Sequence, residues 1–151
     1  CQLMLDYTKI IVLILSTKDP EYEDFRTAIE STWLQDFKKL GIKCYFYEGG
    51  SDINKIEGDY IKLKCPDDLN SVSLKLIESL KVVFENYPET QLVYRTNLSS
   101  YIDVKTFLKF LAKKIAVLPS CVPVSTMFST LNLCLSFKKL LAIKLSPLNG
   151  K

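Results

Sequence analysis

Short apolar runs alternate with amphipathic helical patterns over the first hundred residues, and this alternation restricts the fold more than any other feature. The run IIVLIL, within residues 9–16, is continuous and rich in β-branched side chains, which is typical of a strand buried on both faces of a parallel sheet. Further strands are predicted at residues 42–47, 59–65 and 90–96. The pattern predicts an α/β fold, a three-layer sandwich with a mainly parallel central sheet and right-handed crossovers.

The predicted helices lie between these strands, at residues 25–41, 71–88 and 103–114. Each carries an apolar stripe at helical spacing: Phe25, Ile29, Trp33 and Phe37 in the first, Val72, Leu76, Leu80 and Val83 in the second, and Val104, Phe107, Leu108 and Leu111 in the third. Their ends are also marked, because Gly41 and Pro88 are typical of helix termination and Asp103 of an N-cap.

The polar segment YRTNLSSY, residues 94–101, follows the last predicted strand. In open α/β sheets, ligands bind beyond the carboxyl ends of the strands. We therefore expect residues 16–19, 47–50 and 95–100 to converge at one edge of the sheet and to form the binding site.

Length and composition exclude several classes of protein. The 151 residues fit one compact domain, and the longest apolar run is too short to cross a bilayer. The absence of histidine excludes a histidine base or metal ligand. The five cysteines are odd in number and widely spaced, so we expect buried thiols in a reducing compartment rather than a zinc site or a disulfide framework.

Charge divides the chain unequally. Through Asp103 there are 12 basic and 17 acidic residues, whereas the remainder has 8 lysines and no acid. Because these lysines are scattered without interleaved aromatic residues, we expect no nucleic-acid partner. Residues 119–151 form an atypical basic tail that we expect to be a truncated or out-of-frame end, with only residues 135–145 suggesting a helix. Since the chain begins with Cys1, we also expect it to be a fragment.

Local motifs are individually weak. The segment EGGSD lacks the spacing of a Gly-rich phosphate loop and is better explained as a turn. Asp67 and Asp68 precede a helix, whose N-terminus they would complement electrostatically, with a catalytic carboxylate as the second interpretation. Arg26 and Lys75 suit either solvent or an anion.

Three blocks together resemble a known family. The segment FRTAIESTWL resembles the R-x-A-I-R-x-T-W signature of the fringe and β-1,3-galactosyltransferase group, glycosyltransferase family 31. The segment GDYIKLKCPDDLNSVSLKLIESL is similar to the family block D-I-I-x-x-D-F-x-D-x-Y-x-N-L-T-x-K-T, which aligns Asp59, Asp67 and Lys75. The segment YRTNLSSYIDVKTFLKFL stands where the family has K-x-D-D-D-x-F-V-N. The resemblance covers roughly residues 9–112 and implies a GT-A-like, Rossmann-like fold, incomplete at its C-terminus.

The chain departs from the family pattern at the positions that bind the family's metal and in the half that supplies its catalytic base. The family's acidic triplet, which holds Mn²⁺ and the diphosphate, is here Asn97, Leu98 and Ser99, so no metal site is predicted. The variant RTNLSS resembles glycosyltransferase-like proteins of large DNA viruses and phages. Glu30 replaces a family arginine. The family's second half, with its acidic base, is not recognisable, so no catalytic residue is assigned.

The resemblance implies a nucleotide-sugar-binding domain at residues 1–118 that uses a UDP-sugar donor for hexosyl transfer, with inversion, to a glycan or protein hydroxyl. The candidate binding residues are Thr17, Arg26, Tyr47, Glu48, Lys75, Arg95, Thr96, Asn97 and Ser99. Arg95 and Lys75 would stabilise the leaving diphosphate in place of a cation.

Two alternatives remain open. The first is a catalytically inactive remnant that serves as a binding or scaffold domain. The second is an unrelated nucleotide-binding α/β protein with a response-regulator-like sheet, which would require an acidic cluster after the first strand. The cytoplasm is favoured as the compartment, although cellular members of the family reside in the Golgi lumen. The donor sugar, the acceptor and the oligomeric state stay open.

Overall fold

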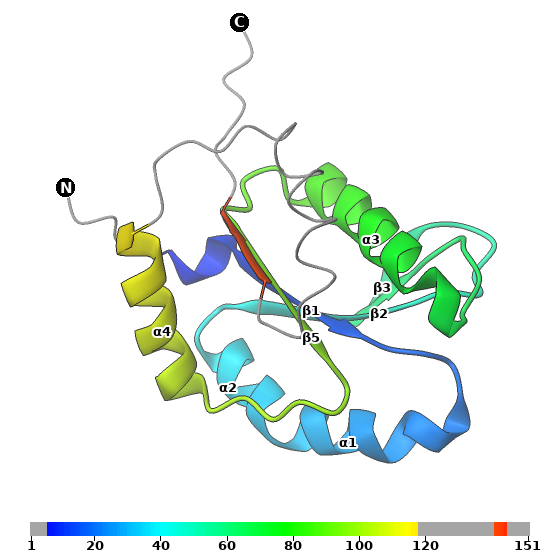
Figure 1. Cartoon of the computed structure of the whole chain (residues 1–151), viewed down its shortest axis with the longest axis horizontal. Coiled ribbons are helices and arrows are strands. Elements are labelled where there is room, and N and C mark those ends of the chain that lie inside the picture. The colour runs from blue at the N-terminus through cyan, green and yellow to red at the C-terminus, as the bar shows by residue number, and fades with distance from the viewer. Residues whose placement is uncertain (1–5, 118–140, 145–151) are drawn as a thin grey trace, which may run out of the picture.

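The computed structural model describes residues 6–117 and 141–144 (Figure 1). Its strands are β1 Ile10–Leu15, β2 Lys43–Glu48, β3 Lys55–Glu57, β4 Tyr60–Lys62, β5 Leu92–Asn97 and β6 Leu141–Lys144. Its helices are α1 Glu23–Ser31, α2 Trp33–Lys39, α3 Val72–Asn86 and α4 Val104–Val117, with short 3₁₀ turns at Tyr7–Lys9, Pro20–Tyr22 and Leu69–Ser71. The predicted strands at residues 9–16, 42–47, 59–65 and 90–96 are thus confirmed. The first and third are shorter than predicted, and the second and fourth end one residue later.

The strands form one mixed, mostly parallel sheet in the order β3-β4-β2-β1-β5-β6. β1 pairs in parallel with β2 and β5, and β2 pairs in parallel with β4. The two outer strands, β3 and β6, run antiparallel to their neighbours. The prediction of an α/β fold with a mainly parallel sheet is confirmed.

Helices cover both faces of the sheet (Figure 1). On one face, Ile10, Val12 and Ile14 of β1 pack with buried side chains of α1, α2 and α4. On the other face, Ile11 and Leu13 pack with buried side chains of α3. Since neighbouring residues of a strand point to opposite faces, the continuous apolar run of β1 supplies both cores. This is the predicted three-layer arrangement.

The first predicted helix is two helices. Thr32 breaks it with φ −119° and ψ −114°, and the hydroxyls of Ser31 and Thr32 both donate to the Ala28 carbonyl, at 3.2 and 2.6 Å. Hydroxyl side chains that bond to the backbone in this way compete with regular helix and bend it. The predicted apolar stripe is right for its last three members, but Phe25 is 48% exposed.

The predicted helix ends are confirmed. Gly41 follows α2 with φ +82°, a conformation that favours glycine. The Asp103 carboxylate accepts hydrogen bonds from the backbone N–H and the hydroxyl of Thr106, which caps α4. The N–H of Tyr87, just before Pro88, donates to Val83 and closes α3.

Two strands were not predicted. β3 pairs with β4 through a two-residue turn, in which Gly58 has φ +60°. Leu141–Lys144 pairs with β5 as β6, so the helix suggested for residues 135–145 is wrong at these four positions, and the rest of that segment lies outside the described residues.

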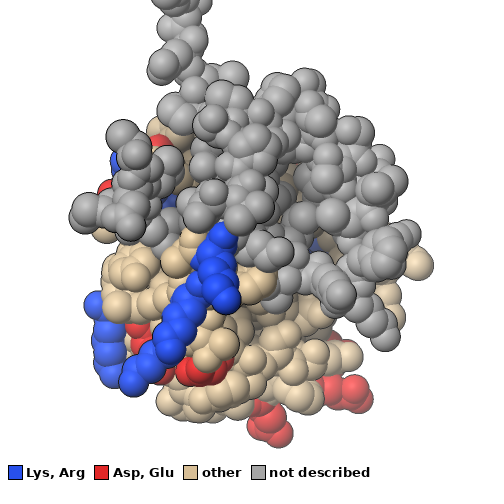
Figure 2. Space-filling model, turned by 60° about the vertical axis from the view of Figure 1, so that its left-hand side comes forward, with Lys and Arg blue, Asp and Glu red and all other residues tan. Residues whose placement is uncertain are grey.

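Three lysines of α4 are on the surface. Lys105, Lys109 and Lys113 follow one another at four-residue spacing and are all exposed. Figure 2 shows a band of basic side chains on the side of the molecule where α4 lies. Among the described residues, no helix has the length and apolar character needed to cross a membrane.

Of the five cysteines, two lie in the described residues with free thiols. Cys44 is buried, and burial raises the pKa of its thiol to about 12. A thiol that stays protonated is a poor nucleophile, so Cys44 acts as a small core residue, as expected. Cys65 is partly buried, and burial raises its pKa as well. Cys1, Cys121 and Cys134 lie outside the described residues.

Candidate functional site

The three predicted loops meet at one edge of the sheet. In the strand register, Leu15 of β1 stands opposite both Tyr47 of β2 and Asn97 of β5. The backbone N–H of Ser16 donates to the Tyr47 carbonyl at 2.9 Å. The carboxyl ends of β1, β2 and β5 therefore lie side by side, which confirms the predicted convergence.

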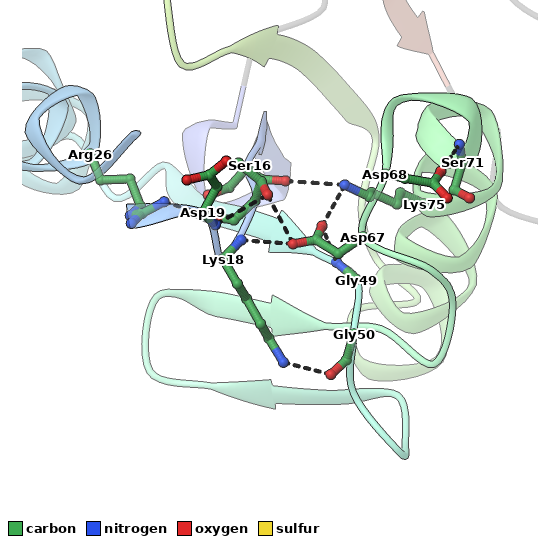
Figure 3. Close-up of polar contacts among 11 residues, drawn as sticks. Ser16, Lys18, Asp19, Arg26, Gly49, Gly50, Asp67, Asp68, Ser71 and Lys75 are labelled. Atoms are coloured by element: carbon green, nitrogen blue, oxygen red, sulfur yellow. Dashed lines mark hydrogen bonds and ion pairs between the residues drawn. The ribbon is translucent and has the colours of Figure 1, made fainter. Parts of the chain in front are cut away.

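Asp67 joins the loops beside this edge (Figure 3). Its Oδ2 accepts hydrogen bonds from the Thr17 hydroxyl at 2.9 Å and from the Lys18 N–H at 2.7 Å. Its Oδ1 accepts from the Gly49 N–H at 3.1 Å and lies 2.5 Å from Lys75 Nζ. One carboxylate thus connects the segments that follow β1 and β2 to the first turn of α3.

The contacts of Asp67 determine its ionisation. Burial alone would raise its pKa, but the hydrogen bonds from the Lys18 N–H, Lys75, the Gly49 N–H and the Thr17 hydroxyl outweigh burial and lower the pKa to about 2. Lys75 is almost fully buried, with 4% of its side chain exposed, and also donates to the Ser16 carbonyl at 3.5 Å. The two charges compensate each other inside the protein.

The segment after β2 requires glycine at Gly49. A Cβ at this position would lie 2.5 Å from the Pro66 carbonyl oxygen and 2.8 Å from that of Cys65. The neighbouring Gly50 has φ +72°, and its N–H donates to the Cys65 carbonyl at 2.7 Å. The predicted turn at EGG is therefore confirmed, and it packs directly on the chain that carries Asp67.

The residues after β1 orient two cations. The Lys18 ammonium donates to the Gly50 carbonyl at 2.6 Å. The Arg26 guanidinium, from α1, donates to the Thr17 carbonyl at 2.5 Å. The Arg26 charge is thus held by the chain after β1, and the Lys18 charge by the turn after β2.

A cavity of about 410 Å³ opens beside these cations, between α1 and the ends of β2 and β4. It is lined by Lys18, Pro20, Glu23, Arg26, Thr27, Glu30, Glu48, Tyr60 and Lys62. Its volume lies in the range of small-molecule sites. The lining combines three acids, Glu48 from β2 and Glu23 and Glu30 from α1, with three cations from separate segments.

Glu48 is the most buried side chain of this lining, at 6% exposed. No described residue donates a hydrogen bond to its carboxyl group. Burial, followed by the nearby Asp67 charge, raises its pKa, while Lys18, Lys62 and Arg26 oppose this shift. Among the described residues no fully buried side-chain oxygen or nitrogen lacks a hydrogen-bond partner. The Glu48 carboxyl oxygens are thus accessible from the cavity and are suited to accept N–H or O–H groups from a ligand.

The other predicted residues lie on β5 and near it. The Arg95 Nε donates to the Tyr47 hydroxyl at 3.0 Å. Tyr47 is fully buried and Thr96 is 6% exposed, whereas Asn97 and Ser99 are exposed. The structure brings Arg26 and Glu48 together at the cavity and Thr17 and Lys75 together at Asp67, while Arg95, Thr96, Asn97 and Ser99 lie outside the cavity lining.

Sequence reasoning included Lys18 in the expected segment 16–19 without naming it as a binding residue, and it missed Tyr60 and Lys62 as cavity residues. The signal for Lys18 was its position directly after a buried strand, which is where open sheets place ligand contacts. Tyr60 and Lys62 alternate along β4 on one face of the sheet, and the predicted strand 59–65 contained both. Their position beside Arg26 and Glu48 depends on contacts between segments far apart in the sequence.

Asp67 and Asp68 were both expected to complement the N-terminus of a helix, and this expectation is right for one of them. The Asp68 carboxylate accepts from the Ser71 N–H at 2.8 Å and caps the turn that leads into α3. Asp67 instead points away from the helix start toward the loops after β1 and β2, and contacts α3 only through Lys75. The two adjacent aspartates differ in role because their carboxylates meet different donors.

The triplet positions do not suit a hard cation. Asn97 and Ser99 offer an amide and a hydroxyl, and Leu98 is buried at 8% exposure, whereas Mn²⁺ in this setting prefers carboxylates. Within residues 6–117 and 141–144, no group of three or more His, Cys, Asp or Glu side chains is arranged to hold a metal ion.

The fold and the site define an α/β protein with a polar, partly cationic cavity at the carboxyl edge of its sheet. A scan against protein-family models and a search of curated proteins each found no match to this chain.

Proposed function

We propose that the chain is a glycosyltransferase-like domain with a GT-A-like fold that binds a nucleotide sugar, a UDP-hexose in the first instance, for hexosyl transfer to a glycan or protein hydroxyl. The observation that carries the proposal is the cavity at the sheet edge, where buried Glu48 lies beside Lys18, Arg26 and Lys62. The family resemblance of residues 9–112 agrees with this location.

A nucleoside diphosphate matches the lining chemically. Its base and ribose carry N–H and O–H donors that the Glu48 carboxyl group can accept. Burial, followed by the charge of Glu30, raises the pKa of Tyr60, so its hydroxyl stays protonated at neutral pH and can donate a hydrogen bond. The diphosphate carries negative charge that lysine and arginine bind well.

The cations proposed for the diphosphate are Lys18, Arg26 and Lys62. This changes the assignment made from sequence, in which Arg95 and Lys75 had that role. Lys75 is buried and its charge is compensated by Asp67 at 2.5 Å, so it is poorly placed to bind a second anion. Fixed cations stabilise the charge that develops on a leaving diphosphate, and no metal-dependent step is proposed.

Asn97 and Ser99 are proposed to contact the sugar or the acceptor. Both are exposed at the carboxyl end of β5, on the same sheet edge as the cavity. Arg95 is half-buried and bonded to Tyr47, which makes it a support of that edge in this proposal. No residue is proposed as the catalytic base.

The proposal is tested by calorimetric titration of the full chain with UDP, UDP-glucose, UDP-galactose and GDP-mannose, first with Mn²⁺ and then with a chelator. We expect UDP compounds to bind and binding to survive chelation. Arg26→Ala and Glu48→Gln should each weaken binding about tenfold, the equivalent of one charge-assisted hydrogen bond.

Lys39→Ala is the matched control, because Lys39 lies on α2 with 76% of its side chain exposed and pairs with Asp36, which is 59% exposed. It should bind like the unaltered chain. If the unaltered chain binds none of the four compounds, the proposal is wrong.

The second candidate is an inactive remnant that serves as a binding domain. It is favoured by one observation, the replacement of the acidic triplet by Asn97, Leu98 and Ser99. Binding of a UDP-sugar with no transfer to any acceptor and no hydrolysis would support it, whereas measurable release of UDP from the donor would exclude it.

A further inference from the structure

Asp67 is absent from the cavity lining, yet it holds the segment that carries Lys18 and that accepts the hydrogen bond of Arg26. We infer that Asp67 is a positioning residue, which fixes residues 16–19 so that Lys18 and Arg26 face the cavity. The consequence for a ligand rests on the proposed function, whereas the effect on the loop does not.

Asp67 reaches Lys18 by two routes (Figure 3). Directly, its Oδ2 accepts from the Lys18 N–H at 2.7 Å. Indirectly, its Oδ1 accepts from the Gly49 N–H at 3.1 Å, and the adjacent Gly50 carbonyl accepts from the Lys18 ammonium at 2.6 Å. The backbone N–H and the ammonium of Lys18 therefore both depend on the position of the Asp67 carboxylate.

Arg26 depends on the same segment. Its Nη1 donates to the Thr17 carbonyl at 2.5 Å, and the Thr17 hydroxyl donates to Asp67 Oδ2 at 2.9 Å. A shift of residues 17 and 18 would move the acceptor of Arg26 and the backbone of Lys18 together. Lys62 comes from β4, and neither route includes it.

A carboxylate is required because four donors converge on its two oxygens. An ionised carboxyl group accepts only, whereas an amide would turn an N–H₂ group toward one pair of donors. Asp67 has 15% of its side chain exposed, so water can replace few of these contacts. The isosteric Asp67→Asn exchange therefore cannot preserve the arrangement.

A simpler explanation is that Asp67 only neutralises Lys75, which is buried nearby. Removal of one partner of such a pair is strongly destabilising, so the single variants alone cannot decide between the two explanations. In a Lys75→Met background Asp67 loses its ion pair but keeps the hydrogen bonds from Thr17, Lys18 and Gly49. Its removal there tests these contacts without leaving a buried ammonium unpaired. All comparisons are therefore made in a Lys75→Met background.

The first experiment measures amide hydrogen exchange in Lys75→Met, Lys75→Met/Asp67→Ala and the control Lys75→Met/Asp68→Ala. We expect the amides of Lys18 and Gly49 to exchange at least about tenfold faster without Asp67, because each loses its acceptor. The amides of Val12 and Ile14 should be unchanged. If the Lys18 and Gly49 amides stay as protected as in the control, the inference is overturned.

The second experiment is a double-mutant cycle for UDP affinity in the same background, with Asp67→Ala, with Lys18→Met and with both. If Asp67 acts through Lys18, each change should weaken binding by about tenfold and the combination should be little worse than either. Fully additive losses would show that Asp67 does not act on the ligand through Lys18 and would overturn that part of its role.

The two proposals fail in different ways. If the unaltered chain binds no UDP, the proposed function is wrong, and the amide exchange alone decides whether Asp67 fixes residues 16–19. If UDP binds but the cycle is additive and the amides are unaffected, the proposed function stands and the positioning role is wrong.

Discussion

Arg95 on β5 donates a hydrogen bond from its Nε to the hydroxyl of Tyr47 on β2, at 3.0 Å, across the intervening β1. Tyr47 is fully buried, and burial raises the pKa of its phenol. The hydroxyl therefore stays protonated near neutral pH and can accept from the guanidinium. The contact links the two strands whose carboxyl ends flank the site.

Replacement of Tyr47 by phenylalanine should remove this link and keep the packing. We expect the free energy of unfolding to fall by about 1 kcal/mol, because half-buried Arg95 can turn partly to water. Urea denaturation followed by the fluorescence of Trp33, the single tryptophan, measures the loss. Tyr101→Phe is the control, because Tyr101 is 77% exposed; equal losses in the two variants would contradict a specific role for the contact.

The close approach of Gly49 to the chain before Asp67 leads to a second prediction. Gly49→Ala would place a Cβ 2.5 Å from the Pro66 carbonyl oxygen, so the two segments must separate. We expect a loss of roughly 2–3 kcal/mol, as for overpacking of a rigid site. Urea denaturation gives the value.

Gly58→Ala is the matched control for that change. Gly58 has φ +60°, and a Cβ added there would meet no described atom within 4 Å, so alanine costs only the left-handed backbone strain, about 1 kcal/mol. If Gly49→Ala is as stable as Gly58→Ala, the backbone at residues 65–67 shifts at little cost to make room for the added Cβ, and the prediction is wrong.

Much of the fold could be predicted because its signals are local. The run IIVLIL, the stripe of α3, Gly41 and Asp103 each express a pattern within one element. The break at Thr32 was missed because four-residue apolar spacing continues through it, while hydroxyl-to-backbone bonding decides against a continuous helix. β3 was missed although Gly58 and Asp59 form a typical hairpin turn.

Only the location of the site could be predicted from the sequence. The convergence of the strand ends follows from parallel topology, but the partners of each side chain depend on contacts far apart in the sequence. Lys75 suited an anion by its position in the sequence, and its charge is instead paired with Asp67. Asp67 itself was assigned to a helix terminus, because its contacts with Lys18 and Gly49 arise from chain segments that no local pattern connects.

Asp67 also leads to a prediction for stability in acid. Its pKa is lowered from an ordinary 3.8 to about 2 in the folded protein, so its contribution is fully present above the unfolded value and is lost as the pH falls from about 4 through 2. The difference corresponds to about 2 kcal/mol of the free energy of unfolding. Burial raises the pKa of Glu48. The stability that Glu48 contributes is therefore present at low pH and is lost as the pH rises through the pKa of this group in the folded protein.

The measurement is the free energy of unfolding by urea between pH 5 and pH 2, in about 0.5 M salt so that exposed ion pairs are screened. The unaltered chain should lose stability steeply below pH 4. The Lys75→Met/Asp67→Ala variant should have a shallower slope in that range, because the carboxyl group that takes up the proton is gone. Identical slopes in the two proteins would contradict the lowered pKa of Asp67 and, with it, the strength of the four hydrogen bonds and contacts that this carboxylate accepts.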